Sequence, residues 1–159
     1  MEISEKNFLE KLADKVPGLS GYRARDDRRE TDKRLREYIA TRLDGVKADV
    51  DATKLDLTNR GNLAALGSVG QFHRRLQRLA DTIRFASYGF SGLFDQVKIK
   101  EAELDRIYNH DLKMVEVVEL LESAVSTLAA DPAPATKALD ALEELVTARK
   151  TLWEAPPEG

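Results

Sequence analysis

The chain has 159 residues, the length of one compact domain, and 42% of them are hydrophobic against 33% charged. This composition provides enough apolar material for a core and argues against general disorder. The absence of Cys excludes disulfides, thiolate zinc sites and Cys nucleophiles, and two His are too few for a multi-histidine metal site. A net charge of -3 excludes a uniformly basic coat for nucleic acid.

Charge is distributed unevenly along the chain. Residues 1–94 hold 18 Lys and Arg and 14 Asp and Glu, net +4, whereas residues 95–159 hold 7 and 14, net -7. The two halves either attract each other within a bundle or a dimer, or attract an anionic partner at one end. The charged start of the chain and the absence of about 18 consecutive apolar residues predict a cytoplasmic protein without a transmembrane segment.

The first expected helix covers about residues 4–16, with Ser4 as its N-cap and Pro17-Gly18 at its end. The second covers about residues 25–58 and would be roughly 50 Å long. Gly45 inside it costs about 1 kcal/mol relative to Ala. Its apolar stripe has the spacing of a bundle or coiled coil and consists of Leu35, Ile39, Leu43, Val46, Val50 and Leu57.

Three more helices follow. Asn59-Arg60-Gly61 predicts a turn, and Asn62 is the expected N-cap of a helix over about 62–87. A fourth helix is expected over about 100–128 and a fifth over about 135–153, separated by Asp131-Pro132-Ala133-Pro134. The predicted fold is all-α, an antiparallel helical bundle built on three long helices with short N-terminal and C-terminal helices. It forms a single domain over 1–155, and 156–159 is a disordered tail.

Four charged residues interrupt the apolar stripes. Arg25, Arg28 and Asp32 lie on the arc of the second helix that continues into its aliphatic stripe, and Asp111 lies on the apolar face of the fourth helix. Because an unpaired buried carboxylate is costly, we expect Asp111 to meet an arginine of the second helix or a Tyr hydroxyl. This polar seam either fixes helix register, runs past the bundle end into solvent, or floors a binding pocket.

Two basic segments are candidates for contact with anions. Residues 23–36 hold seven basic and four acidic side chains, so a solvated, ion-paired helix is the favoured interpretation. Arg74, Arg75 and Arg78 form a second basic face, of which Arg74 and Arg78 lie opposite the apolar stripe of the third helix. Such a face suits anionic lipid or nucleic acid, and a merely solvated surface is the alternative.

No catalytic or metal-ligand motif is present. The chain lacks a P-loop, a nucleophile elbow and an HExxH zinc motif. A di-iron bundle needs Glu three residues before His, but Gly70 and Ile107 occupy those positions. We therefore expect no enzymatic activity, no metal and no cofactor.

Three sets of segments carry a family resemblance. One set lies near the start of the chain and consists of Val16-Pro17-Gly18, Gly21-Tyr22 and the run from Arg28 to Arg36. Another lies in the fourth expected helix and consists of Glu103-Leu104-Asp105, Tyr108 and Asp111. The remaining set, which is the most specific, is an aromatic turn that consists of Tyr88, Gly89, Phe90, Gly92, Phe94 and Asp95. Together they resemble an uncharacterised family of bacterial all-helical proteins. The resemblance implies a cytoplasmic, non-enzymatic protein. We hypothesise that the aromatic turn folds back over the end of the bundle and covers the polar seam.

The sequence predicts a non-enzymatic cytoplasmic helical scaffold or protein–protein interaction module, which binds another protein or itself. A helix of about 50 Å carries more apolar surface than we expect a small bundle to cover. The alternative is a peripheral adaptor that binds anionic membrane or nucleic acid through Arg74, Arg75 and Arg78. An enzyme with its pocket at the polar seam is the third hypothesis.

Overall fold

The computed structural model describes residues 5–19, 28–85 and 101–149, and every regular element in these ranges is helical. This confirms the predicted all-α class. The elements in chain order are α1 (Glu5–Lys15), α2 (Arg28–Arg60), α3 (Leu63–Arg84), α5 (Glu101–Ala124), the 3₁₀ turn η1 (Val125–Thr127) and α6 (Ala133–Arg149).

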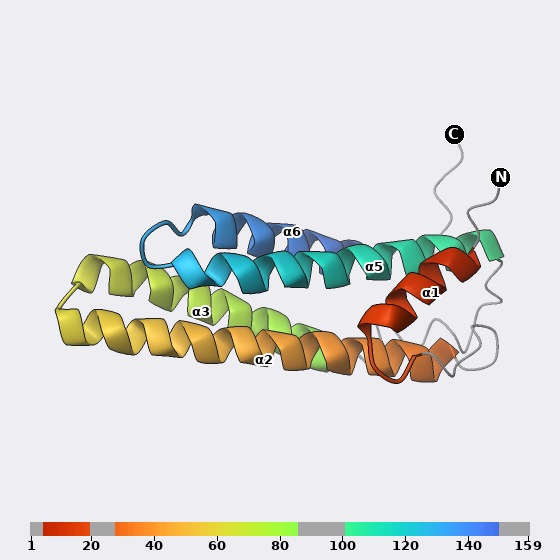
Figure 1. The fold of residues 1–159 in the computed structure, drawn as a ribbon, viewed down its shortest axis with the longest axis horizontal. Helices are drawn as coiled ribbons and strands as arrows, with labels where there is room; N and C mark the ends of the chain where they lie inside the picture. Colours follow the sequence, from red (N-terminus) through yellow and green to blue (C-terminus); the bar gives the residue numbers. More distant parts are fainter. Residues whose placement is uncertain (1–4, 20–27, 86–100, 150–159) are drawn as a thin grey trace.

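Two helical hairpins pack against each other, and α1 crosses one end of the pair (Figure 1). Helices α2 and α3 lie side by side and run in opposite directions, as do α5 and α6. Helix α1 packs on α5. At the left of Figure 1, the tip of the α2–α3 hairpin projects beyond the link between α5 and α6.

The apolar stripes of the helices meet in one core. All six predicted stripe residues of α2 are buried, and they pack with buried residues of α3, α5 and α6. The chain itself therefore covers this stripe, contrary to the expectation that so long a helix leaves apolar surface uncovered. Burial of one Leu or Ile side chain contributes about 1.5–3 kcal/mol, so packing, rather than intrinsic helix propensity, stabilises α2.

The end of α1 is held against α2. The backbone of Gly18 has a φ of +92°, which favours glycine, and lets the chain turn after Pro17. A Cβ at Gly18 would lie 2.9 Å from Nη1 of Arg34 on α2. The next residue, Leu19, is buried in the core. The predicted stop at Pro17-Gly18 thus also places the start of the chain on the bundle.

The link between α2 and α3 is shorter than predicted. Asn59 and Arg60 belong to α2, so that only Gly61 and Asn62 connect the helices. Gly61 adopts a φ of +72°, and its N–H donates to the carbonyl of Thr58 at 3.1 Å. The predicted N-cap is confirmed, because the side chain of Asn62 accepts a hydrogen bond from the N–H of Ala65 at 3.2 Å.

The link between α5 and α6 also departs from the predicted bounds. Helix α5 ends at Ala124, and η1 tightens the chain before the break. Helix α6 begins at Ala133, two residues earlier than expected, with Pro134 in its first turn. Proline is tolerated there because the first N–H groups of a helix have no intrahelical acceptor.

Two glycines provide a matched test of backbone conformation. Gly45 lies inside α2 and Gly61 in the left-handed turn, and an added Cβ would meet nothing within 4 Å at either position. We expect Gly45→Ala to raise the free energy of unfolding by about 1 kcal/mol. Gly61→Ala should lower it by about 1–2 kcal/mol, because Cβ disfavours this φ. Chemical denaturation of both variants measures the difference, and equal effects would contradict the assigned conformations.

Candidate functional site

Arg149, the last residue of α6, is buried at 1% exposure between two carboxylates. Its Nε donates to Oδ1 of Asp111 at 2.7 Å, and its Nη2 donates to Oδ2 of Asp111 at 3.2 Å. Nη2 also donates to Oδ1 of Asp32 at 2.8 Å. Asp32 belongs to α2 and Asp111 to α5, so one guanidinium joins three helices.

Arg36 extends this network to α3. Its Nε donates to Oδ2 of Asp32 at 3.0 Å, and its Nη1 donates to the carbonyl of Arg84 at 3.3 Å. Arg84 is the last residue of α3, where carbonyls lack intrahelical partners and a cation is favourable. We call Asp32, Arg36, Asp111 and Arg149 the buried ion network. It contacts all four helices of the two hairpins.

The charges of the buried ion network balance. Burial raises the pKa of the Asp111 carboxyl, although the charge and hydrogen bonds of Arg149 oppose this shift. Burial also disfavours the charged form of Arg149, but Asp111 and Asp32 outweigh it and raise the pKa of the guanidinium. Two carboxylates and two guanidiniums thus neutralise one another, as buried charges require.

The groups of the network are engaged with one another, which points to a structural role. In the described part of the chain, no three His, Asp or Glu side chains are placed to hold a metal ion. Thr31 precedes Asp32, and its hydroxyl is buried with no hydrogen-bond partner among the described residues. This arrangement fits the first interpretation of the polar seam, an ion pair that fixes helix register.

The structure brings together two of the four predicted seam residues, Asp32 and Asp111. Arg25 lies outside the described residues, as do the side chain of Arg28 and the whole aromatic turn. The described partner of Asp111 is Arg149 of α6, rather than the arginine of α2 or the Tyr hydroxyl that we expected. The sequence held the signal for it, because Arg149 continues the spacing of the buried Leu139, Leu142 and Val146.

The predicted basic face on α3 is only partly exposed. Arg74 and Arg78 are exposed, but Arg75 extends toward α6. Its Nη2 donates to Oε1 of Glu143 at 2.7 Å and also pairs with Asp140. The hydrogen bond with Glu143 raises the pKa of Arg75, although burial opposes the shift. Arg75 therefore does not belong to a free basic surface.

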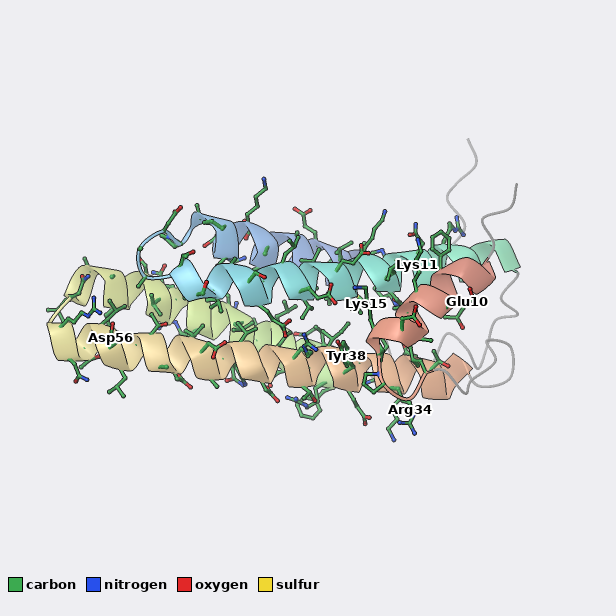
Figure 2. The ribbon with its side chains drawn as sticks, in the orientation of Figure 1. Glu10, Lys11, Lys15, Arg34, Tyr38 and Asp56 are labelled. Carbon is green, nitrogen blue, oxygen red and sulfur yellow. The ribbon has the colours of Figure 1, made fainter. Side chains whose placement is uncertain are left out.

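Ion pairs between the two charge halves support attraction within the bundle. Lys15 of α1 donates to Glu119 of α5 at 3.0 Å, and Figure 2 shows Lys15 beside α5. Arg42 of α2 donates to Glu122 of α5 at 2.6 Å, and its guanidinium carbon lies 5.4 Å from the ring centroid of Tyr38. In each pair the base comes from residues 1–94 and the acid from residues 95–159.

Both histidines contact neighbouring helices. Nε2 of His73 lies 3.1 Å from Oδ1 of Asp51, which joins α3 to α2. Nε2 of His110 lies 2.6 Å from the carbonyl of Leu145, which joins α5 to α6. These contacts fit packed histidines.

No family model, curated protein or solved structure matches this chain. In the described ranges, none of the helices combines the length and the apolar character needed to cross a bilayer.

The buried ion network predicts a large, pH-dependent effect of Arg149→Met. The change leaves the buried carboxylate of Asp111 without its described cation and leaves Asp32 with Arg36 alone. It should cost about 3–5 kcal/mol of unfolding free energy at neutral pH. Removing Arg149 raises the already elevated pKa of Asp111 further. The loss relative to wild type should therefore shrink as the pH falls and Asp111 takes up a proton.

Arg75→Met is the matched control for this prediction. Like Arg149, Arg75 pairs with two carboxylates, here Asp140 and Glu143 of α6, but it lies partly in solvent. The change should cost no more than about 1 kcal/mol. Urea denaturation of both variants between acidic and neutral pH measures the comparison. Equal losses, or an Arg149→Met loss that does not change with pH, would contradict the structural role.

Proposed function

We propose that this protein is a non-enzymatic cytoplasmic helical scaffold or protein–protein interaction module. The finer architecture proposed for it is an antiparallel bundle built on three long helices, α2, α3 and α5, with α1 and α6 as its shorter members. The family resemblance noted above agrees with a non-enzymatic role.

The observation that carries this proposal is the contrast between the interior and the surface. The interior charges satisfy one another, whereas three large apolar side chains of the α2–α3 hairpin are exposed, namely Leu55, Leu63 and Phe85. Single exposed leucines are ordinary, but Leu55 and Leu63 both lie near the tip of the hairpin, and Phe85 lies just past the other end of α3. These side chains offer apolar contact surface to another protein at the two ends of the hairpin. Burial of exposed apolar surface is the main favourable term in most protein–protein association.

A binding experiment tests this role. Native lysate is passed over the immobilised full chain. The retained protein is identified and purified, and its saturable binding to the chain is titrated. We expect the variant Leu55→Ser/Leu63→Ser/Phe85→Ser to bind at least about tenfold more weakly, the equivalent of about 1.4 kcal/mol. Leu120→Ser is the control, since Leu120 is exposed on α5. A chain that retains no partner and sediments as a strict monomer would refute the proposal.

The second candidate is a peripheral adaptor for anionic membrane or nucleic acid. The exposed Arg74 and Arg78 favour it, whereas the ion pairs of Arg75 weaken it. Only two cations of the predicted basic face are left for phosphate groups. Because each neutralised phosphate contributes to affinity and to its salt dependence, so small a face gives weak binding.

Titration with anionic vesicles and with oligonucleotides across salt concentrations separates the two candidates. For a scaffold, we expect no binding that weakens as salt rises. Binding that falls with salt and is lost in Arg74→Gln/Arg78→Gln, but kept in Arg75→Gln, would favour the adaptor instead.

A further inference from the structure

The outer face of the α2–α3 hairpin carries a protruding side chain on one helix and a gap on the other. Leu55 on α2 is 63% exposed. On α3, a Cβ at Gly67 would meet nothing within 4 Å, and a Cβ at Gly70 would meet only Nη1 of Arg74, at 3.8 Å. Glycine lowers the stability of a helix, and no neighbouring atom of residues 5–19, 28–85 and 101–149 requires it at Gly67. Gly67 leaves the backbone of α3 open to close approach, whereas at Gly70 the end of the Arg74 side chain lies beside the backbone and has to move aside.

Hydrogen bonds inside the hairpin fix which parts of α2 and α3 lie at the same level. Lys47 donates to Gln77 at 3.1 Å, and His73 lies 3.1 Å from Asp51. Both helices rise 1.5 Å per residue in opposite directions. Counting from these contacts toward the tip places Leu55 level with the turn of α3 between Gly67 and Gly70.

The same count places opposite charges at one level. Arg74 follows His73 directly, so it lies level with the exposed Asp51. Asp51 and Arg74 lie on different helices of the hairpin. If α2 of one molecule packs against α3 of a second, Asp51 of each molecule faces Arg74 of the other.

We propose that a second copy of this chain docks on this face, which we call the hairpin face, consisting of Ala48, Asp51, Leu55, Gly67, Gly70 and Arg74. A twofold axis parallel to the helices keeps every residue at its level and exchanges the two sides of the hairpin. It therefore sets α2 against α3 of the second copy, in antiparallel orientation. The interface is isologous, and each contact occurs twice.

Shape and charge agree in this arrangement. Leu55 enters the gap at Gly67 and Gly70 of the second copy, and the small Ala48 leaves room for the long side chain of Arg74 from that copy. Asp51 faces the same Arg74. The opposite choice, α2 against α2, sets Asp51 near its own counterpart, and like charges at an interface disfavour such a pairing.

This dimer rests on the proposed interaction role and names its partner. Sedimentation equilibrium of the full chain at several concentrations tests it. We expect a reversible dimer that Leu55→Asp converts to a monomer with unchanged helical content. Leu120→Asp is the matched control, because Leu120 is also 63% exposed but lies on α5, and this variant should stay dimeric.

Charge reversal provides a second test that does not depend on Leu55. Arg74→Asp should raise the dissociation constant of the dimer at least about tenfold, and the double variant Asp51→Arg/Arg74→Asp should restore it. A wild-type chain that is monomeric at all concentrations, or one dissociated equally by Leu55→Asp and Leu120→Asp, would overturn the dimer. A monomer that still binds a lysate protein saturably refutes only the dimer, whereas a monomer without any partner refutes the interaction role as well.

Discussion

The position of Arg149 constrains the whole bundle. A guanidinium removed from water must find carboxylates at the same place, and these come from two other helices, Asp32 of α2 and Asp111 of α5. A shift of α6 by one turn would separate these groups by about 5.4 Å and leave buried charges unpaired. The hydrophobic stripes can slide past one another at moderate cost, but the ion network cannot. The network is therefore satisfied in the register in which the stripes pack.

The outer ion pairs agree with this register without determining it. Arg42 with Glu122 and Arg75 with Glu143 join the basic first half of the chain to its acidic second half. These groups remain partly in water, so each pair contributes little to stability. Their common direction explains the uneven charge of the sequence as attraction within one molecule. The surface then has less free charge for an anionic partner than the composition indicates.

Periodicity predicts the faces of single helices but not which faces meet. It located the helices, the buried stripe of α2 and the anomalous carboxylates Asp32 and Asp111. It missed Arg149, which continues an apolar stripe of α6, because a cation at a helix end is equally consistent with solvent. It also assigned Arg36 and Arg75 to solvated surfaces, although both join helices far apart in the sequence. Such pairs become visible only when the helices are placed side by side.

Residues that the packing of the chain does not require indicate where another molecule binds. A natural sequence agrees with its structure at most positions, so an unfavourable residue without an internal reason indicates a requirement elsewhere. Gly67 is such a residue, since it weakens α3 and no atom of the described residues would lie within 4 Å of a Cβ there. Leu55 is 63% exposed, and it gains weight from its position level with Gly67. Because both lie on the outer side of one hairpin and at matching levels, a single external helix surface accounts for both.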